Sequence, residues 1–296
     1  MRNIVVSGHC QTNGVAAALA ELMPDDKVTA LPLPSIYGTP EDVFIPAAHA
    51  ADIWIHGADQ AFLDKHGLNP GTRGAPAQLG LPLIYFDAFH PDTCMLMQRG
   101  SGEIFHDQPL SSAITAWAWQ HGLLPDEVPA LFHKNVFAAL GYFDRWVANV
   151  EHLRRTFATA GWADEFDRFF LNVQRTGNFM HTFNHPKVHV LASLAKMLAA
   201  RLGCDEAVWA RDVNVQDILA VVTWPLYPDV ADSYGLAGGS YQWRWHGEHQ
   251  TSVQAFAETS YLAYARCNLG TKDTVICGVD GPMLDRVLGP LCGVAA

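Results

Sequence analysis

Short apolar runs alternate with amphipathic stretches through the first part of the chain. Four runs suit buried parallel strands, because each is only a few residues long and ends in Gly, Pro or Asp. They are Asn3–Val6, Val28–Leu33, Asp52–Ile55 and Leu83–Phe86. Between the first two, apolar residues recur at helical spacing, which makes residues 3–33 a βαβ unit. The pattern predicts an open parallel sheet that binds its ligand beyond the carboxyl ends of its strands.

From residue 111 onward the hydrophobic pattern becomes helical. Asp126 can cap one helix whose apolar positions keep the 3.6-residue period over residues 128–150. Pro186 opens a second long helix, and Gly203 ends it. Two more helices are expected near Gln250–Ala265 and Gly281–Leu288.

These patterns together predict an α/β protein. A Rossmann-like or SGNH-like head, with a short N-terminal parallel sheet and helices, is elaborated by a largely α-helical body. No internal repeat, low-complexity tract or linker divides the chain, so we expect one domain over residues 1–296, with the head at 1–110 and the body at 111–296. The carboxyl edge of the sheet is expected to gather Cys10, the loop 55–59 and the loop 87–92.

Composition and charge exclude several classes of protein. With 49% hydrophobic residues the chain can bury a large core, and a formal charge of −11 disfavours a nucleic-acid surface. No apolar run approaches the roughly 20 residues of a membrane helix, and the first run is too short for a secretory signal. Any membrane association is expected to be peripheral, for example at membrane assembly machinery. Six cysteines without a C-x-x-C pair indicate reduced thiols and a cytoplasmic protein.

The first candidate for chemistry is Cys10, within the stretch SGHCQTNG. A thiol at a strand-to-helix turn gains from the free N–H groups and positive dipole end of the helix, which favour the thiolate. The same N–H groups can bind an oxyanion while an acyl group is attacked. Cysteine is also among the most frequently buried residues, so Cys10 could simply pack a tight turn. From spacing alone the two interpretations are equal.

A thiol nucleophile needs a base, and His185 is the candidate. It lies directly before Pro186, where the helix dipole disfavours the imidazolium form. Asn184 or His181 could orient its ring, although His185 could instead only cap the helix. His181, His185 and His189 repeat every four residues, a spacing seen in zinc sites, but Pro186 separates the first from the other two. We therefore expect no metal.

Three further segments carry candidate binding residues. Phe89–Asp92 offers His90 and a carboxylate at a strand end, either for substrate or for a turn. Tyr241–His246 interleaves aromatic rings with Arg244, which could stack a sugar or an adenine or could pack the domain. Two cations, Arg175 and Lys187, are candidate phosphate contacts, although solvated surface charge is the ordinary alternative.

Three motifs resemble those of one family, the WcbI-like polysaccharide biosynthesis proteins of bacterial capsule loci. Members open with a strand and a G-N-C-Q turn and later carry F-N-H-P before a helix. The matching residues are Gly8-His9-Cys10-Gln11 and Phe183-Asn184-His185-Pro186, with Phe89-His90-Pro91-Asp92 between them. His9 departs from the pattern, because the family usually has Asn at that position.

The resemblance implies a coenzyme A binding protein, thought to be an acetyltransferase that acts on surface polysaccharide. It implies Cys10 as nucleophile, His185 as base with Asn184 beside it, and Gln11 next to the oxyanion site, with His9 taking the place of the usual Asn. The candidates for contacts with coenzyme A or acetyl-CoA are Gly8, His9, His90, Arg175, Lys187 and Arg244.

The leading hypothesis is an acyl-CoA-dependent O-acyltransferase in which Cys10 takes the acyl group and passes it to a saccharide hydroxyl. In a variant of it, His185 deprotonates the sugar and Cys10 only lines the site. Alternatives are a cysteine-dependent esterase or thioesterase, a non-catalytic module that binds coenzyme A or a nucleotide, and a zinc enzyme.

Overall fold

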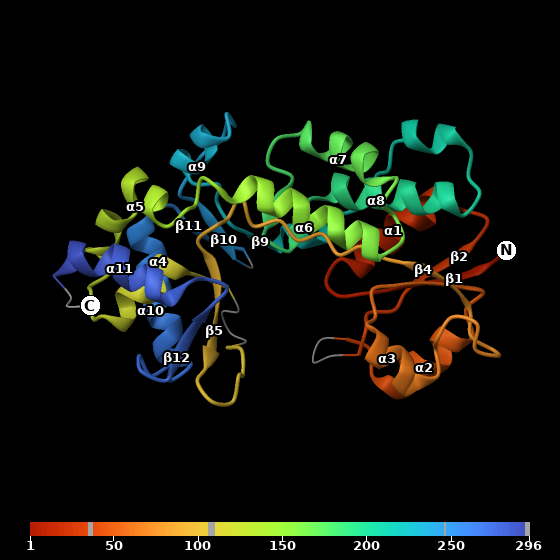
Figure 1. The fold of residues 1–296 in the computed structure, drawn as a ribbon, viewed down its shortest axis with the longest axis horizontal. Coiled ribbons are helices and arrows are strands. Elements are labelled where there is room, and N and C mark those ends of the chain that lie inside the picture. The colour runs from red at the N-terminus through yellow and green to blue at the C-terminus, as the bar shows by residue number, and fades with distance from the viewer. Residues whose placement is uncertain (35–37, 106–109, 246, 294–296) are drawn as a thin grey trace. The chain divides into compact units, whose positions relative to one another are not determined.

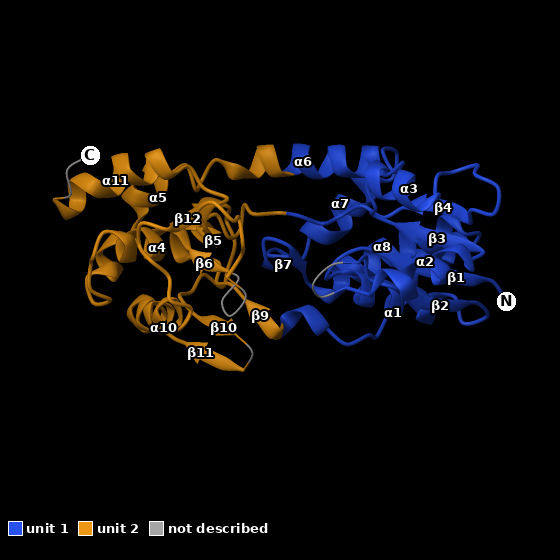
Figure 2. Ribbon diagram, turned by 90° about the horizontal axis from the view of Figure 1, so that it is seen from below, with its two compact units in different colours: residues 1–85, 150–220 blue, residues 86–149, 221–296 orange. Residues whose placement is uncertain are grey.

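The computed structural model describes residues 1–34, 38–105, 110–245 and 247–293 (Figure 1). The chain forms two compact units, which Figure 2 colours separately. Unit 1 comprises residues 1–85 and 150–220, and unit 2 comprises residues 86–149 and 221–296. Each unit is therefore made from two separate parts of the chain. The assignment of one domain over residues 1–296 stays a prediction.

Unit 1 is built on a four-stranded parallel sheet with the order β2-β1-β3-β4, which confirms the predicted α/β fold with an N-terminal parallel sheet. The strands are β1 (Asn3–Ser7), β2 (Lys27–Ala30), β3 (Ile53–His56) and β4 (Ala77–Gly80). The register pairs Ser7 with His56, and His56 with Gly80. Three strands therefore end level with one another at the carboxyl edge.

One predicted strand is wrong. The fourth strand of the sheet is β4, whereas the run Leu83–Phe86 lies outside it. The backbone of Ile84 is held by a side chain, since its N–H donates to Gln11 Oε1 at 3.2 Å and its carbonyl accepts from Gln11 Nε2 at 2.7 Å. The amide of Gln11 thus supplies the pair of hydrogen bonds that a neighbouring strand would supply.

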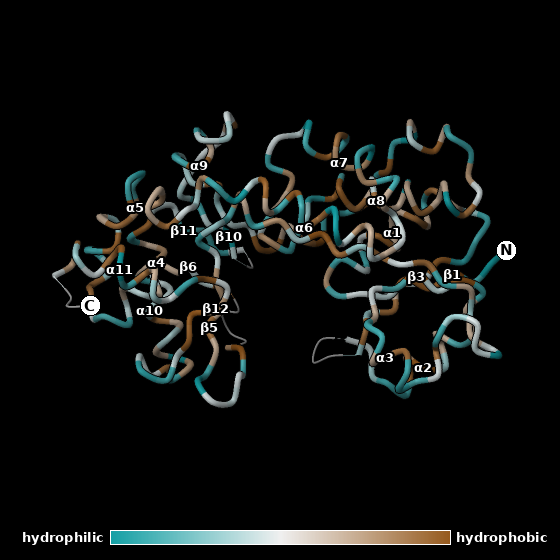
Figure 3. Tube along the Cα trace, viewed as in Figure 1, coloured by the Kyte–Doolittle hydropathy of each residue, from teal (hydrophilic) through white to brown (hydrophobic). Residues whose placement is uncertain are grey.

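Helices cover both faces of the sheet of unit 1, with α1 and α8 on one side and α2 and α3 on the other (Figure 1). These and the other elements of unit 1 are α1 (Thr12–Leu22), α2 (Glu41–His49), α3 (Gln60–His66), α7 (Phe166–Gln174), β7 (Met180–Thr182), β8 (His185–Pro186), α8 (Val188–Arg201) and η2 (Glu206–Ala210). Strands β1 and β3 are strongly hydrophobic (Figure 3), and their Val5 and Trp54 pack with Phe44 of α2. On the other face α1 approaches α8 closely, because a Cβ atom at Gly14 would lie 2.4 Å from Leu191.

Two elements cross from one unit to the other along the chain: α6 (Arg145–Thr159) and the 3₁₀ helix η3 (Ile218–Val221). Unit 2 combines helices with two small antiparallel sheets, ordered β12-β5-β6 and β11-β10-β9. Its strands are β5 (Thr93–Gln98), β6 (Ser111–Ser112), β9 (Val222–Thr223), β10 (Trp243–Trp245), β11 (Glu248–Gln250) and β12 (Thr274–Cys277). Its helices are α4 (Ala113–Gln120), η1 (Val128–Leu131), α5 (Lys134–Ala139), α9 (Pro228–Ser233), α10 (Val253–Arg266) and α11 (Gly281–Cys292).

The predicted helix over residues 128–150 is wrong as a single element, because the chain forms η1, α5 and the start of α6 instead. Pro129 lies in the 3₁₀ turn, and Gly141 after α5 has a φ of +71°, which interrupts the helix. The other predicted helices are confirmed in α8, α10 and α11, although Pro186 precedes α8 in strand β8. Among the described residues, no helix is both long and apolar enough to cross a membrane.

Candidate functional site

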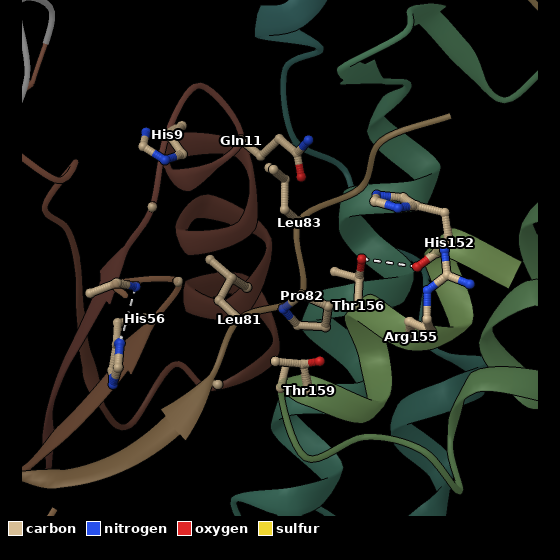
Figure 4. Close-up of a pocket in the computed structure, with 15 residues that line it drawn as sticks. His9, Gln11, His56, Leu81, Pro82, Leu83, His152, Arg155, Thr156 and Thr159 are labelled. Carbon is tan, nitrogen blue, oxygen red and sulfur yellow. Dashed lines mark hydrogen bonds between the residues drawn. The ribbon is translucent and has the colours of Figure 1, made fainter. Parts of the chain in front are cut away.

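A cavity of about 600 Å³ lies in unit 1 beyond the carboxyl ends of β1, β3 and β4 (Figure 4). Its wall on one side includes His9 and His56, and helix α6 supplies the facing wall. Sheet and helix approach closely at Gly80, where a Cβ atom would lie 2.4 Å from the carbonyl oxygen of Ala160. This is the position at which open parallel sheets bind their ligands.

The turn that carries Cys10 opens directly onto this cavity. Its neighbours Gly8, His9 and Gln11 line the cavity, and the N–H of Thr12 donates to the carbonyl of His9 at 3.1 Å as helix α1 begins. Cys10 itself is exposed, and its Sγ lies 3.8 Å from the carbonyl oxygen of Asn184, to which the thiol can donate. The GHCQ turn and the FNHP segment, 174 residues apart in sequence, therefore meet in space.

The sequence predicts that the surroundings of Cys10 favour the thiolate, but in the structure they favour the thiol. Partial burial of the sulfur among neighbouring atoms raises the pKa of Cys10, even though the residue as a whole is accessible to solvent. The backbone N–H groups of Cys10 and Gln11 act in the opposite direction and lower the pKa, as expected at the start of a helix. Because burial outweighs these N–H groups, the thiol form predominates at neutral pH.

Gln11 joins three segments of unit 1 and is buried, with 3% of its surface exposed. Its Nε2 donates to the carbonyl of Ile84 at 2.7 Å and to the carbonyl of Asn184 at 3.0 Å. Both hydrogens of the amide are thereby used. The side-chain amide of Gln11 thus has no N–H left for an oxyanion and instead holds the turn against the segment of Asn184, while its backbone N–H faces the Cys10 sulfur, so its place next to an oxyanion site stays a prediction.

His185 lies next to the contact of Cys10 with Asn184 and has the properties of a base. Burial, followed by the nearby His181, lowers its pKa, while the backbone of Leu219 acts in the opposite direction. Its Nδ1 is buried and has no hydrogen-bond partner among the described residues. The ring is therefore neutral at pH 7, through burial more than through the predicted helix dipole. Among the described residues, no hydrogen bond joins the His185 ring to Cys10.

The side chains that could orient His185 have other partners. Asn184 Oδ1 accepts a hydrogen bond from the Thr182 hydroxyl at 2.9 Å. His181 Nε2 lies 2.8 Å from Asp217 Oδ2, and this carboxylate also accepts from the N–H of Val188 at the start of α8. The segment is therefore braced by Asp217 rather than by a direct partner of the His185 ring.

The absence of a metal centre stays a prediction, and the zinc alternative lacks a ligand set among the described residues. In the described ranges no three His, Cys, Asp or Glu side chains are grouped so that they could hold a metal ion. His189 Nε2 instead contacts the Thr176 hydroxyl at 2.9 Å.

The predicted contacts with coenzyme A fall into three groups. Gly8 and His9 line the cavity, and His9 is exposed there. Arg175 is exposed at the end of α7 but does not line this cavity, and Lys187 Nζ donates to the carbonyl of Asn178 at 2.6 Å.

The third group belongs to unit 2. His90 is 1% exposed, which leaves it no surface for a ligand, and Arg244 lines a cavity of unit 2. The loop 87–92 belongs to unit 2, whereas the parallel sheet and its loops belong to unit 1. The expectation that the loop 87–92 lies at the carboxyl edge of this sheet rested on the strand predicted at Leu83–Phe86, which the structure does not contain. His246, the last residue of the aromatic segment, lies outside the described residues.

Sequence reasoning missed the residues that α6 contributes to the cavity. They are His152, Arg155, Thr156 and Thr159, which occur at positions i, i+3, i+4 and i+7 of the helix. That spacing places them on one face, so the pattern H-x-x-R-T-x-x-T was a signal available in the sequence. Arg155 is exposed and has no hydrogen bond or ion pair within the described ranges, which leaves its guanidinium available to an anion.

His56, at the end of β3, belongs to the loop 55–59 that the sequence predicts at this edge, and it lines the cavity. The N–H of Ala58 donates to its Nδ1 at 3.2 Å, so Nε2 carries the proton and donates to Gln78 Oε1 at 3.0 Å. Burial lowers its pKa, with Gln78 acting in the opposite direction. His56 is thus a neutral ring that stacks on Trp54 with ring centroids 4.0 Å apart and forms a fixed wall of the cavity.

Comparison with known proteins identifies the family. The profile of a family described as the polysaccharide biosynthesis enzyme WcbI matches residues 3–207, which is more than half of the chain. The chain belongs to the WcbI family. This confirms the resemblance inferred from the GHCQ and FNHP motifs, both of which lie within the matched residues.

A solved WcbI structure has the same fold. It is described as a novel polysaccharide biosynthesis enzyme, in its native form without a disulfide bond between coenzyme A and one of its cysteines. The match has a TM-score of 0.68 at 15% identity and covers 98% of this chain and 96% of that chain.

Two other comparisons add no argument about this WcbI family member. A Streptococcus pneumoniae AdcAII structure matches with a TM-score of 0.22 and 12% identity, covering 88% of this chain and 98% of that one, which is too weak to inform the fold. No curated protein matches the sequence.

Proposed function

We propose that this WcbI family member is an acyl-CoA-dependent O-acyltransferase, with acetyl-CoA as donor and a saccharide of surface polysaccharide biosynthesis as acceptor. One observation carries the proposal. Cys10 Sγ lies 3.8 Å from the carbonyl of Asn184, immediately before His185, and the neighbours of Cys10 line the cavity of about 600 Å³. A thiol and a neutral imidazole in adjacent segments at the mouth of a cavity are the groups that acyl transfer requires.

The residues of the cavity fit the phosphates and adenosine of coenzyme A. Arg155 offers a guanidinium without a protein partner among the described residues. His152 is exposed on the same helix, and His9 is exposed on the facing wall. The volume is within the range of about 300 to 1,000 Å³ typical of small-molecule sites. The WcbI structure with the same fold is described in terms of coenzyme A and a cysteine, which supports placing the thiol end of the donor near Cys10.

In the proposed reaction, Cys10 passes its proton to His185 and its sulfur attacks the acyl carbonyl carbon. The bond from that carbon to the sulfur of the donor breaks, and coenzyme A leaves as the thiol after taking the proton. A saccharide hydroxyl then gives its proton to His185 and attacks the thioester on Cys10. The products are the sugar ester and the free Cys10 thiol, and the exchange of one thioester for another is nearly isoenergetic.

Two polar residues have positioning roles in this scheme. Gln11 holds the turn of Cys10 to the segment of Asn184, and Asp217 braces that segment through His181 and the start of α8. Because the pKa of Cys10 is raised, transfer of its proton to His185 must accompany the attack on the acyl carbon.

The test is mass spectrometry of the protein after mixing with acetyl-CoA. We expect an acetyl adduct on Cys10 in the absence of saccharide, and loss of adduct and turnover in Cys10→Ser. Cys204→Ser, a partly buried cysteine of the same unit outside the cavity, is the matched control and should react normally. An absent adduct together with full activity of Cys10→Ser would falsify the covalent route. Equal release of free acetate with and without saccharide would indicate the hydrolase instead.

The raised pKa of Cys10 and the absence of a hydrogen bond to His185 favour one second candidate, a module that binds coenzyme A without chemistry. It predicts unchanged coenzyme A affinity in His185→Ala, measured by calorimetry, and no turnover of acetyl-CoA by the wild-type protein with any saccharide. Measurements on the wild-type protein, Cys10→Ser and His185→Ala therefore distinguish the acyltransferase from the binding module.

A further inference from the structure

Unit 2 contains a cavity that the proposed acyl transfer does not use. It has a volume of about 250 Å³ and lies between the sheet β9–β11 and helix α10. The strand β10 is central, with Trp245 opposite Val222 of β9 and opposite Glu248 of β11. The whole lining belongs to unit 2, so this cavity is separate from the one beside Cys10.

The inner part of this cavity is aromatic. Trp243 stacks on Phe256 of α10 with ring centroids 4.3 Å apart and planes 17° from parallel, and Trp224 meets Phe256 edge-on at 5.4 Å. These rings also stabilise the fold, because Trp243 is only 2% exposed. Its indole Nε1 is nevertheless buried without a hydrogen-bond partner in the part of the chain that the structure describes. A buried N–H of this kind normally has a partner.

The outer part of the cavity is polar and accessible. Trp245 is half-buried, Arg244 Nη2 donates to the Thr223 hydroxyl at 3.0 Å, and Glu248 and Arg266 are exposed. Neither Glu248 nor Arg266 forms an ion pair within the described residues. The lining therefore combines an accessible indole with charged donors and a carboxylate acceptor at the rim.

We propose that this cavity binds one sugar ring of a saccharide. A pyranose has an apolar C–H face, which packs on an indole, and an equatorial rim of hydroxyls that both donate and accept hydrogen bonds. Trp245 matches the face, Glu248 accepts from hydroxyls, and the guanidinium groups donate to hydroxyl or ring oxygens. The site goes beyond the acyl transfer, since it holds a saccharide in unit 2 independently of Cys10.

The size of the cavity favours a sugar over coenzyme A. The volume of about 250 Å³ is below the roughly 300 Å³ at which drug-sized ligands begin to fit, and it suits a single ring. The carboxylate of Glu248 offsets the charge of one of the two arginines, Arg244 and Arg266, and is a favourable acceptor for neutral hydroxyls.

The test is ligand-observed saturation-transfer NMR on the full chain without any acyl donor. The probes are glucose, galactose, mannose and N-acetylglucosamine, with adenosine 3′,5′-bisphosphate as the nucleotide probe. We expect at least one sugar to receive saturation on its ring protons. Its affinity should fall about tenfold in Trp245→Ala and several-fold in Glu248→Gln. The second variant alters one exposed carboxylate and keeps the fold. Trp209→Ala, which changes a half-buried tryptophan of unit 1, should leave the affinity unchanged.

Three results overturn the proposal. They are saturation of none of the four sugars, sugar binding that both variants of the cavity leave intact, and saturation of only the nucleotide probe that Trp245→Ala abolishes. Because no acyl-CoA is present, failure here is distinguishable from failure of the acyltransferase proposal. Acylation of Cys10 can fail while sugars bind in unit 2, and the reverse also holds.

Discussion

The turn of Cys10 in unit 1 and the cluster around Asp92 in unit 2 both come from short motifs at strand ends, yet they are built in opposite ways. Asp92 is completely buried and accepts from the hydroxyl of Tyr142 at 2.9 Å and from that of Tyr227 at 2.7 Å. The N–H of Ile114 donates to the same carboxylate at 3.1 Å. Cys10 is exposed, and Nδ1 of the nearby His185 is unpaired among the described residues.

The difference separates a group that is ready for a ligand from a group that holds the fold. A buried carboxylate surrounded by donors has no capacity left for a substrate, whereas an exposed thiol does when the neutral imidazole beside it keeps an Nδ1 without a partner among the described residues. The motif FHPD resembles the family pattern as much as GHCQ does, but its carboxylate joins α4, α5 and α9 of unit 2 through their neighbouring residues. A polar motif at a strand end is therefore not by itself a site.

The largest expected effect that tests this contrast is loss of the base. His185→Ala should lower kcat/KM for acyl transfer by about 10²- to 10³-fold, because the Cys10 proton then has no acceptor. The wild-type rate should fall on the acid side as the pH drops through the lowered pKa of His185, below the ordinary histidine value. His189→Gln is the control, since His189 contacts Thr176 instead. A variant that retains full activity would remove His185 from the mechanism.

The next effect concerns the amide that secures the turn. Gln11→Leu leaves the N–H and carbonyl of Ile84 and one hydrogen bond to Asn184 unmet, so we expect the free energy of unfolding to fall by about 3 kcal/mol. Urea denaturation measures it. Gln254→Leu, at an exposed glutamine of α10, should change stability by less than about 0.5 kcal/mol. Equal effects of the two substitutions would contradict the role assigned to Gln11.

A smaller effect is expected from one donor to Asp92. Tyr227→Phe removes a hydrogen bond to a buried carboxylate and should cost about 2 kcal/mol at pH 8, where Asp92 is ionised. The cost should be smaller at pH 5, because the neutral carboxyl accepts more weakly. Tyr234→Phe loses only a 3.4 Å contact with the carbonyl of Tyr142 and serves as control in the same denaturation series. A cost that does not vary with pH would argue against an ionised Asp92.

The smallest effect is the pH dependence that Asp92 itself causes. Burial raises the pKa of Asp92 to about 6, while the surrounding donors lower it less. A carboxyl with a raised pKa contributes stability at low pH that is lost as the pH rises through that pKa. Between pH 5 and pH 7 the loss should be about 1 kcal/mol, and Asp92→Asn should abolish it. The comparison of the two unfolding profiles isolates this group from the other carboxylates.

Much of unit 1 was predictable because its signals are local. Three of the four strands, the crossover helix after Cys10 and the helix after Pro186 follow from apolar periodicity and from Pro and Gly positions. The strand predicted at Leu83–Phe86 is wrong because the backbone of this run hydrogen-bonds to the side chain of Gln11 and not to a neighbouring strand. The hydrophobic periodicity of the sequence does not distinguish these two kinds of partner. The single helix predicted over residues 128–150 is wrong because the apolar positions keep a helical period throughout, although Pro129 and Gly141 interrupt the helix.

The candidate site was predictable only in part. Cys10, Asn184 and His185 come from motifs, and the structure brings Cys10 and Asn184 into contact. The raised pKa of Cys10 could not be predicted, since it depends on atoms packed around the sulfur. Arg155 and its neighbours on α6 could be recognised as one helical face, but no local pattern says which cavity that face meets. His90 and Arg244 were assigned to the same ligand as Gly8 and His9, but they belong to unit 2, and no local pattern in the sequence shows this division of the chain.

Gly80 has a consequence for how such a cavity can diverge among related proteins. Because a Cβ atom there would meet the carbonyl of Ala160 at 2.4 Å, any side chain must displace the last turn of the wall that carries Arg155. The displacement would move this wall relative to the sheet without altering any side chain that lines the cavity. The width of this cavity therefore depends on the absence of a side chain at Gly80, and we expect the single methyl group of an alanine there to change it.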